Sequence, residues 1–144
     1  MVENNPDKNL NILLVDDTPM NLSLVSKLLH RRGHEVDTAE NGRQAFEAYQ
    51  NKTYDVILMD VHMPIMDGLE ATRKIREYEM EWNKNNQDNP KFRVPIIAST
   101  ANDDRADMEL YTQAGMDGLI TKPIDIKTMI PTIREIIQQC KDKS

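Results

Sequence analysis

Residues 54 to 64 read "YDVILMDVHMP", and the apolar run inside this stretch decides the fold. Residues 56–59 are consecutive apolar side chains without alternation, which is typical of a strand buried on both faces of a parallel sheet. The run ends in a carboxylate, Asp60. An ionised side chain at the edge of a core costs free energy unless a nearby group compensates it, so Asp60 predicts such a group.

The composition indicates one globular domain. The chain has 144 residues, which is long enough to bury a core without disulfides. Its 39% hydrophobic and 29% charged residues are typical of a folded chain rather than a disordered one. The net charge of -6 argues against nucleic acid and against an anionic membrane as direct partners of this domain.

The location is predicted from cysteine usage and from the N-terminal sequence. Cys140 is the single cysteine, so neither an internal disulfide nor a cysteine-based zinc site is possible. The first residues, "MVENNPDKNLN", lack the apolar core of a signal peptide, and no apolar run approaches the roughly 18 residues of a membrane span. We therefore expect a cytoplasmic protein, or a cytoplasmic piece of a longer one.

Apolar runs alternate with segments of helical periodicity along the chain. Five strands are expected, at residues 10–15, 35–39, 54–60, 94–100 and 118–122. A helix is expected after each, and this alternation predicts an α/β fold with a parallel sheet and right-handed crossovers. The domain is expected to span residues 10–140, between polar tails at 1–9 and 141–144.

Capping residues predict where the helices begin and end. Thr18 and Asn41 are the expected N-caps of the first two helices, and Asp67 that of the third. The third helix is expected to end near Tyr78 or Trp82. The following Asn-rich residues 83–93 are expected to form a mobile loop.

The last two helices are less clearly bounded. The fourth is expected to begin at Asp103 or Asp104. Pro131 falls inside the last helical pattern, where it removes a hydrogen bond and clashes with the preceding turn. That helix is therefore expected to kink, or to start later than Asp125 suggests.

Polar side chains collect where the strands end. Ligands of open α/β sheets bind at the carboxyl ends of the strands. The strand ends supply Asp16 and Asp17, Asp60, Ser99 and Thr100, and Thr121 and Lys122. Three carboxylates that converge with one ammonium group repel one another, so a cation is expected among them. Oxygen ligands without histidine or cysteine favour a hard ion, and we expect Mg²⁺.

This set of groups suits phosphoryl chemistry. Mg²⁺ and Lys122 can neutralise phosphoryl oxygens, the Thr100 hydroxyl can donate to another, and Asp60 can attack phosphorus to form an acyl phosphate. An acidic pair after a strand is most often only a helix cap or a turn. The interpretation therefore depends on all the groups lying at the same edge of the sheet.

Other candidate residues have plainer explanations. His62 has no second histidine nearby, so a surface residue is the better interpretation of its ring. Met20, Met63 and Met66 are expected to pack around the rim, where their soft side chains make an adaptable docking surface.

Several stretches carry a resemblance to a known family. These are "ILLVDDTPMN", "AENGRQAF", "YDVILMDVHMPIMDGLEATRKIR", "VPIIASTAN", "AGMDG" and "ITKPI". The chain resembles the receiver domain of two-component response regulators along nearly its whole length, and most of all the receivers of hybrid histidine kinases. The fold expected on this basis is a doubly wound, flavodoxin-like sheet of five parallel strands in the order 2-1-3-4-5, with five helices on both faces.

The resemblance implies a role for each residue of the site. Asp60 would accept a phosphoryl group from the phosphohistidine of a histidine kinase or a histidine phosphotransfer protein. The Mg²⁺ ligands would be Asp16, Asp17, Asp60 and the backbone carbonyl of His62. Thr100 would be the switch hydroxyl and Lys122 the phosphate-binding lysine. Phosphorylation and hydrolysis would be self-catalysed, so the isolated domain is not expected to be an enzyme, although a hybrid kinase that contained it would be.

One position departs from the family pattern. Family members often carry an aromatic residue three positions before the lysine, and Leu119 stands there in this chain. An aromatic side chain that rotates inward on phosphorylation therefore does not explain how this domain would pass on its signal. Conformational change and onward transfer to a histidine phosphotransfer protein both remain open, as does the oligomeric state.

Three other functions fit the sequence less well. A Mg²⁺-dependent phosphatase that works through a phosphoaspartate usually carries DxD after its first strand, but here Thr18 occupies the third position. A flavodoxin-like cofactor binder needs a hydroxyl- or glycine-rich phosphate loop, where this chain has two negative charges. A partner-binding domain that takes no phosphate has no support, because all the site residues are present.

Overall fold

The computed structural model describes residues 9–90, 93–100, 107–122 and 125–142. Strands and helices alternate through this part of the chain, as expected from the sequence. The elements are β1 (Asn11–Val15), α1 (Pro19–Arg31), β2 (Glu35–Ala39), α2 (Gly42–Asn51), β3 (Val56–Asp60), α3 (Gly68–Asn85), β4 (Ile96–Thr100), α4 (Met108–Ala114), β5 (Gly118–Thr121) and α5 (Ile126–Asp142).

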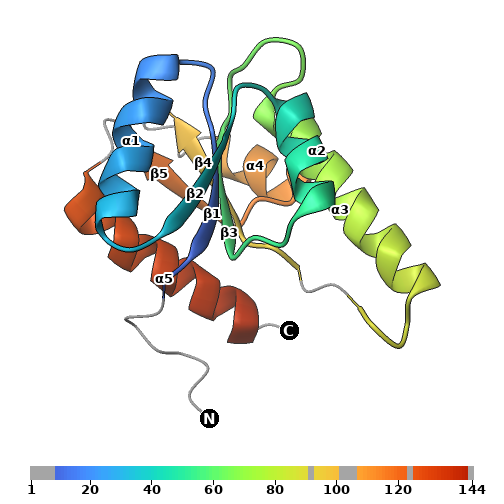
Figure 1. The fold of residues 1–144 in the computed structure, drawn as a ribbon. Helices are drawn as coiled ribbons and strands as arrows, with labels where there is room; N and C mark the ends of the chain where they lie inside the picture. The colour runs from blue at the N-terminus through green and yellow to red at the C-terminus, as the bar shows by residue number, and fades with distance from the viewer. Residues whose placement is uncertain (1–8, 91–92, 101–106, 123–124, 143–144) are drawn as a thin grey trace.

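The five strands form one parallel sheet in the order β2-β1-β3-β4-β5, which confirms the predicted topology (Figure 1). Because all the strands are parallel, their carboxyl ends lie along the same edge of the sheet. The segments that follow β1, β3, β4 and β5 therefore meet there.

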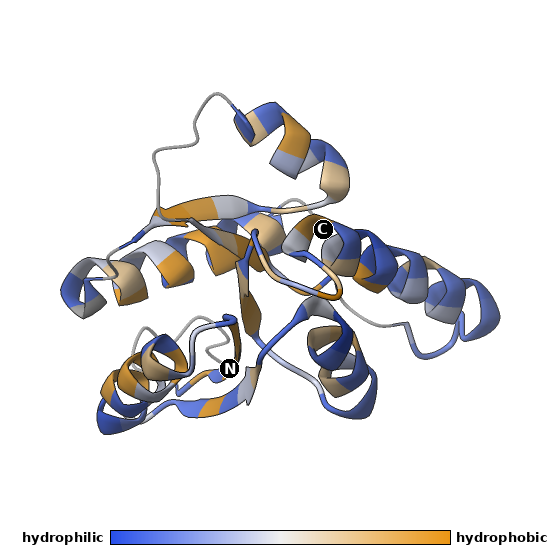
Figure 2. Ribbon diagram, turned by 90° about the horizontal axis from the view of Figure 1, so that it is seen from above, coloured by the Kyte–Doolittle hydropathy of each residue, from blue (hydrophilic) through white to orange (hydrophobic). Residues whose placement is uncertain are grey.

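Two hydrophobic clusters cover the two faces of the sheet. Helices α2, α3 and α4 contribute residues such as Ala45, Ile75 and Tyr111 to the first cluster, and α1 and α5 contribute residues such as Leu29 and Ile133 to the second. The hydrophobic residues of the strands lie in the centre, between helices whose outer surfaces are largely hydrophilic (Figure 2). The predicted arrangement of helices on both faces is confirmed.

Two of the three predicted helix caps form as expected. The side chains of Asn41 and Asp67 accept backbone N–H groups of their own helices, at 2.9 and 2.8 Å. Thr18 occupies the N-cap position of α1, but its side chain makes no capping hydrogen bond. The Asp16 carboxylate accepts the backbone N–H of Thr18 itself at 2.8 Å, which fixes the chain just before the helix.

The third helix is longer than the sequence predicted. We expected α3 to end near Tyr78 or Trp82, but it continues to Asn85, so the prediction of a loop from residue 83 is wrong for its first three residues. The rings of Tyr78 and Trp82 lie 6.4 Å apart on one side of the helix. The Asn86 side chain donates to the Trp82 carbonyl at 2.9 Å, and the Trp82 indole N–H donates to the Asn89 carbonyl at 3.1 Å. These contacts favour the additional turn.

The last two helices agree in part with the sequence. Asp103 and Asp104, the predicted starts of α4, lie outside the described residues, whereas the helix ends at Gly115 as expected, with φ at +112°. Helix α5 contains Pro131, so the alternative of a later helix start is wrong. Pro131 is exposed. The helix runs to Asp142 and includes the first two residues of the stretch predicted as a tail.

No helix within the described ranges is both long enough and apolar enough to cross a bilayer.

His34 makes the stability of the fold depend on pH. It is buried, and its Nδ1 accepts the Leu10 N–H at 3.0 Å. Burial, followed by the nearby charges of Arg134 and Arg32, lowers the pKa of His34 below 6.5. The unfolded chain therefore binds more protons than the folded chain just below pH 6.5, and the free energy of unfolding falls as the pH drops through that range.

We expect replacing His34 with asparagine to flatten this pH dependence. Urea unfolding of the wild type between pH 7 and pH 5 should show a decreasing free energy of unfolding, and His34→Asn should show a shallower decrease. The exposed His30 supplies the matched control, since His30→Asn should retain the wild-type slope. Equal slopes for wild type and His34→Asn would contradict this role for the buried imidazole.

Candidate metal centre

Asp16 and Asp17 directly follow β1, and the fold holds them differently. The Asp16 N–H donates to the Ala39 carbonyl at 3.1 Å, which continues the pairing of β1 with β2. The Asp16 side chain is only 5% exposed and accepts the Thr18 N–H. Asp17 is exposed. One carboxylate is therefore fixed by its surroundings, and its neighbour remains accessible from solvent.

Asp60 is the last residue of β3 and is also 5% exposed. Its Oδ1 accepts the His62 N–H at 3.3 Å. The preceding strand residues are fully buried, as the apolar run predicted, so the strand holds this carboxylate at the edge of the core.

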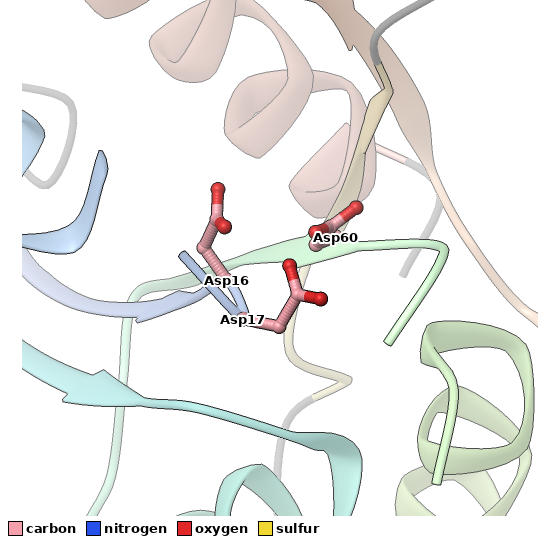
Figure 3. Close-up of side chains that lie close together, drawn as sticks. All are labelled: Asp16, Asp17 and Asp60. Atoms are coloured by element: carbon pink, nitrogen blue, oxygen red, sulfur yellow. The ribbon is translucent and has the colours of Figure 1, made fainter. Parts of the chain in front are cut away.

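The three carboxylates come together at the carboxyl edge of the sheet. One oxygen from each of Asp16, Asp17 and Asp60 lies within 4.8 Å of the others. Figure 3 shows Asp16 and Asp17 beside one another and Asp60 arriving from the neighbouring strand. Oxygen donors of this kind, without histidine or cysteine, fit Mg²⁺. The exposed Asp17 leaves an open side where water and a phosphoryl oxygen could complete the coordination.

Lys122 supplies the positive charge that the sequence predicted at this edge. Its Nζ lies 2.9 Å from Asp16 Oδ2 and 3.5 Å from Asp60 Oδ2. Its backbone N–H donates to the Thr100 carbonyl at 2.7 Å, which fixes the start of the side chain beside the end of β4. The ammonium group thus joins a carboxylate that follows β1 to the carboxylate that ends β3.

Among the described residues, the site brings three carboxylates together with one ammonium group. Burial raises the pKa of Asp60; Lys122 and the His62 N–H act against this effect, while Asp16 and Asp17 add to it. Burial alone would lower the pKa of Lys122, but its hydrogen bond to Asp16 and the charge of Asp60 raise it. Lys122 does not offset the burial of Asp60 and its crowding by Asp16 and Asp17, and an added cation would favour the ionised form of Asp60.

The loop from β3 to α3 is held tightly against the site. A Cβ at Gly68 would overlap the Asp60 carbonyl oxygen, so only glycine fits there. The Gly42 N–H donates to the Met66 carbonyl at 2.8 Å and ties the loop to α2. Within the loop, the Met66 N–H donates to the Pro64 carbonyl at 2.7 Å, and the residue between them, Ile65, has φ at +69°. This conformation is strained for a β-branched residue.

The other predicted site residues lie in the expected region. Thr100 ends β4 and is 1% exposed, and His62 is exposed, as the sequence suggested for its ring. Two features of the rim were missed. Ile65 is 77% exposed, and no sequence signal predicts its positive φ. Ser99, which the sequence identifies only as a residue at a strand end, has a buried hydroxyl group without a hydrogen-bond partner among the described residues.

Arg76 makes a buried ionic cluster that was also missed. Its guanidinium group lies 2.8 Å from Glu79 and 2.8 Å from Asp117. Glu79 accepts the Val94 N–H and Asp117 accepts the Ile96 N–H, both just before or at the start of β4. This cluster therefore lies at the amino ends of the strands, away from the carboxylates, and joins α3 to β4 and β5.

Comparison with known proteins identifies relatives along most of the chain. The family model described as the response regulator receiver domain matches residues 12–134. The chain is 40% identical over 135 residues to hybrid signal transduction histidine kinase I of Dictyostelium discoideum. The matched region covers 90% of this chain and 7% of that kinase. The chain spans 7% to 15% of the length of such curated relatives, and it corresponds to the receiver domains of hybrid histidine kinases.

Solved structures share the fold. The receiver domain of sensor histidine kinase PA1611 from Pseudomonas aeruginosa PAO1, with magnesium coordinated in its active-site cleft, is 35% identical, with a TM-score of 0.73 over 91% of this chain and 99% of that one. A second match comes from the Saccharomyces cerevisiae complex between the phosphotransfer protein Ypd1 and the receiver domain of Ssk1. It is 26% identical, with a TM-score of 0.80 over 88% of each chain.

Proposed function

This chain belongs to the response regulator receiver domain family, and we propose on that premise that it is the phosphoacceptor module of a two-component phosphorelay. Asp60 takes the phosphoryl group from a phosphohistidine. The observation that carries the proposal is the convergence of Asp16, Asp17 and Asp60 within 4.8 Å, with the Lys122 ammonium 3.5 Å from Asp60.

The transfer makes one bond and breaks one. An Asp60 carboxylate oxygen bonds to phosphorus while the phosphorus–nitrogen bond of the phosphohistidine breaks, and the imidazole nitrogen keeps the electron pair. Asp60 Oδ1 accepts the His62 N–H and Oδ2 faces Lys122, so both oxygens are oriented before the donor arrives. Lys122 then pairs with the negative charge that the phosphoryl group brings.

We assign Mg²⁺ as the cofactor, held by Asp16, Asp17, Asp60 and the backbone carbonyl of His62. When bound, it neutralises the carboxylates and the phosphoryl oxygens that approach them. The donor set supports this assignment, as does the magnesium ion in the related PA1611 receiver domain. The Thr100 hydroxyl is assigned as the donor to a further phosphoryl oxygen.

The partners follow from the same proposal. The donor is a histidine kinase or a histidine phosphotransfer protein, which is supported by the hybrid kinase relatives and by the Ypd1 complex of a related receiver domain. One phosphoryl group is accepted per transfer, so the isolated domain does not turn over a substrate as an enzyme does. A cytoplasmic location belongs to the proposal and rests on the single Cys140.

The output is conformational change or onward phosphotransfer. Leu119 is partly buried and packs against the hydrophobic cluster beneath α2, α3 and α4. Unlike a tyrosine at this position, its aliphatic side chain has no hydroxyl group that could form a hydrogen bond. Onward transfer to a histidine phosphotransfer protein does not need an aromatic switch, so we favour this route.

Transfer from a purified donor tests the proposal. A histidine phosphotransfer protein carrying ³²P on its histidine should lose the label to this chain in the presence of Mg²⁺. The label on this chain should be lost in alkali, as expected of an acyl phosphate. If a panel of phosphorylated histidine donors transfers no label while the chain is folded, the proposal fails.

A further inference from the structure

Ser99 has a hydroxyl group that the fold buries without providing it a partner. The residue is 6% exposed, and its Oγ is inaccessible to solvent. No hydrogen-bond partner for it lies among the described residues. A buried hydroxyl group without a partner costs free energy, and alanine at the same position would avoid that cost.

The sheet register places Ser99 directly beside Asp60. The two residues are register partners on the adjacent parallel strands β3 and β4. Two residues earlier, the register partners Leu58 and Ile97 both pack into the cluster beneath α1 and α5. Because side chains alternate along a strand, Asp60 and Ser99 leave the sheet on that same face.

Lys122 approaches the same carboxylate, Asp60, from the other side of β4. On the other side of Ser99, its register partner on β5 is Ile120, two residues before Lys122. The Lys122 ammonium lies against Asp16 and Asp60. Because β4 lies between β5 and β3, the lysine side chain must pass the carboxyl end of β4 to reach them.

We propose that Ser99 is a positioning residue for Asp60, an inference that rests on the function proposed above. Its hydroxyl group donates to the Asp60 carboxylate when the metal site is occupied. This hydrogen bond fixes the rotation of the carboxylate, so that one oxygen faces the incoming phosphorus. The existing contacts with His62 and Lys122 are long, at 3.3 and 3.5 Å, so a third contact adds a constraint that they do not supply.

The matched pair Ser99→Thr and Ser99→Val tests the inference. These variants are nearly isosteric and differ by a hydroxyl group in place of a methyl group. With acetyl phosphate as the donor and saturating Mg²⁺, the bond from phosphorus to acetate breaks as the bond to Asp60 forms. We expect the threonine variant to be labelled at close to the wild-type maximal rate and the valine variant about tenfold more slowly. The acetyl phosphate concentration at half-maximal rate should be unchanged.

Ser99→Ala serves as a further variant in case the larger threonine and valine side chains disturb the packing around residue 99. It should be labelled as slowly as the valine variant, although its thermal unfolding midpoint should equal or exceed that of the wild type. Wild-type rates in the alanine variant, or equal rates in the threonine and valine variants, would overturn the inference. Labelling that persists in Asp60→Asn would instead overturn the proposed function, so the two failures are distinguishable.

Discussion

Asp60→Asn is expected to reduce phosphoryl labelling of the chain to background, with phosphohistidine and with acetyl phosphate donors alike. An amide oxygen is a far weaker nucleophile than a carboxylate and cannot form the acyl phosphate. The variant should still fold. Burial already disfavours the charged form of Asp60, as its raised pKa shows, and Lys122 retains its contact with Asp16 at 2.9 Å. The thermal unfolding midpoint without metal should therefore be unchanged or higher.

Asp55 offers a control on the same strand. It directly precedes β3, at the opposite end from Asp60, and its carboxylate accepts the Asn11 N–H at 2.7 Å. Asp55→Asn retains an oxygen that can accept this bond, so it should fold and should be labelled like the wild type. Labelling of Asp60→Asn at a comparable rate would reveal a different acceptor, whereas loss of labelling in Asp55→Asn would show that the assay responds to damage elsewhere.

Removal of Mg²⁺ is expected to stop labelling as completely as the loss of Asp60. Without the cation, the donor phosphoryl group must approach three carboxylates, and among the described residues Lys122 is the cation that offsets their charge. Chelation should bring the labelling rate to background, and added Mg²⁺ should restore it. Labelling that continues in excess chelator would refute the role of the metal.

The same ion should stabilise the folded chain when no phosphoryl donor is present. At a Mg²⁺ concentration ten times the dissociation constant, binding to the folded state contributes about 1.4 kcal/mol, which is a rise of about 4 °C in the unfolding midpoint. Asp17→Asn should abolish this rise at little cost to the metal-free protein, because Asp17 is exposed. Asp88→Asn, at another exposed acidic residue, should retain the rise.

The fold was predictable because its signals are local. Buried runs such as residues 56–59 identify the strands, and caps such as Asn41 and Asp67 fix helix starts through contacts three residues away. The length of α3 was not predictable in the same way. Its final turn is supported by the contact between the tilted rings of Trp82 and Tyr78 and by contacts with the segment beyond the helix, which the Asn-rich sequence does not signal.

The convergence of the site was predictable from strand ends, whereas its fine structure was not. Parallel strands bring residues 16, 17, 60 and 122 to one edge whatever the intervening sequence is. By contrast, a β-branched residue such as Ile65 is not expected to have a positive φ. Contacts of the surrounding loop, such as the hydrogen bond from the Gly42 N–H to the Met66 carbonyl, support this conformation. The sequence likewise does not show that the Ser99 hydroxyl group is buried without a hydrogen-bond partner beside Asp60, because this depends on the register of β3 and β4.

The central claim is that the acidic cluster exists so that one of its carboxylates can carry a phosphoryl group. The most direct measurement is mass spectrometry of the wild-type chain after it has been labelled in Mg²⁺ and reduced with borohydride, which converts a phosphoaspartate to homoserine. The account predicts that residue 60 is converted and that the other aspartates are not. Conversion at another aspartate, or none in a folded and metal-loaded chain, would contradict it.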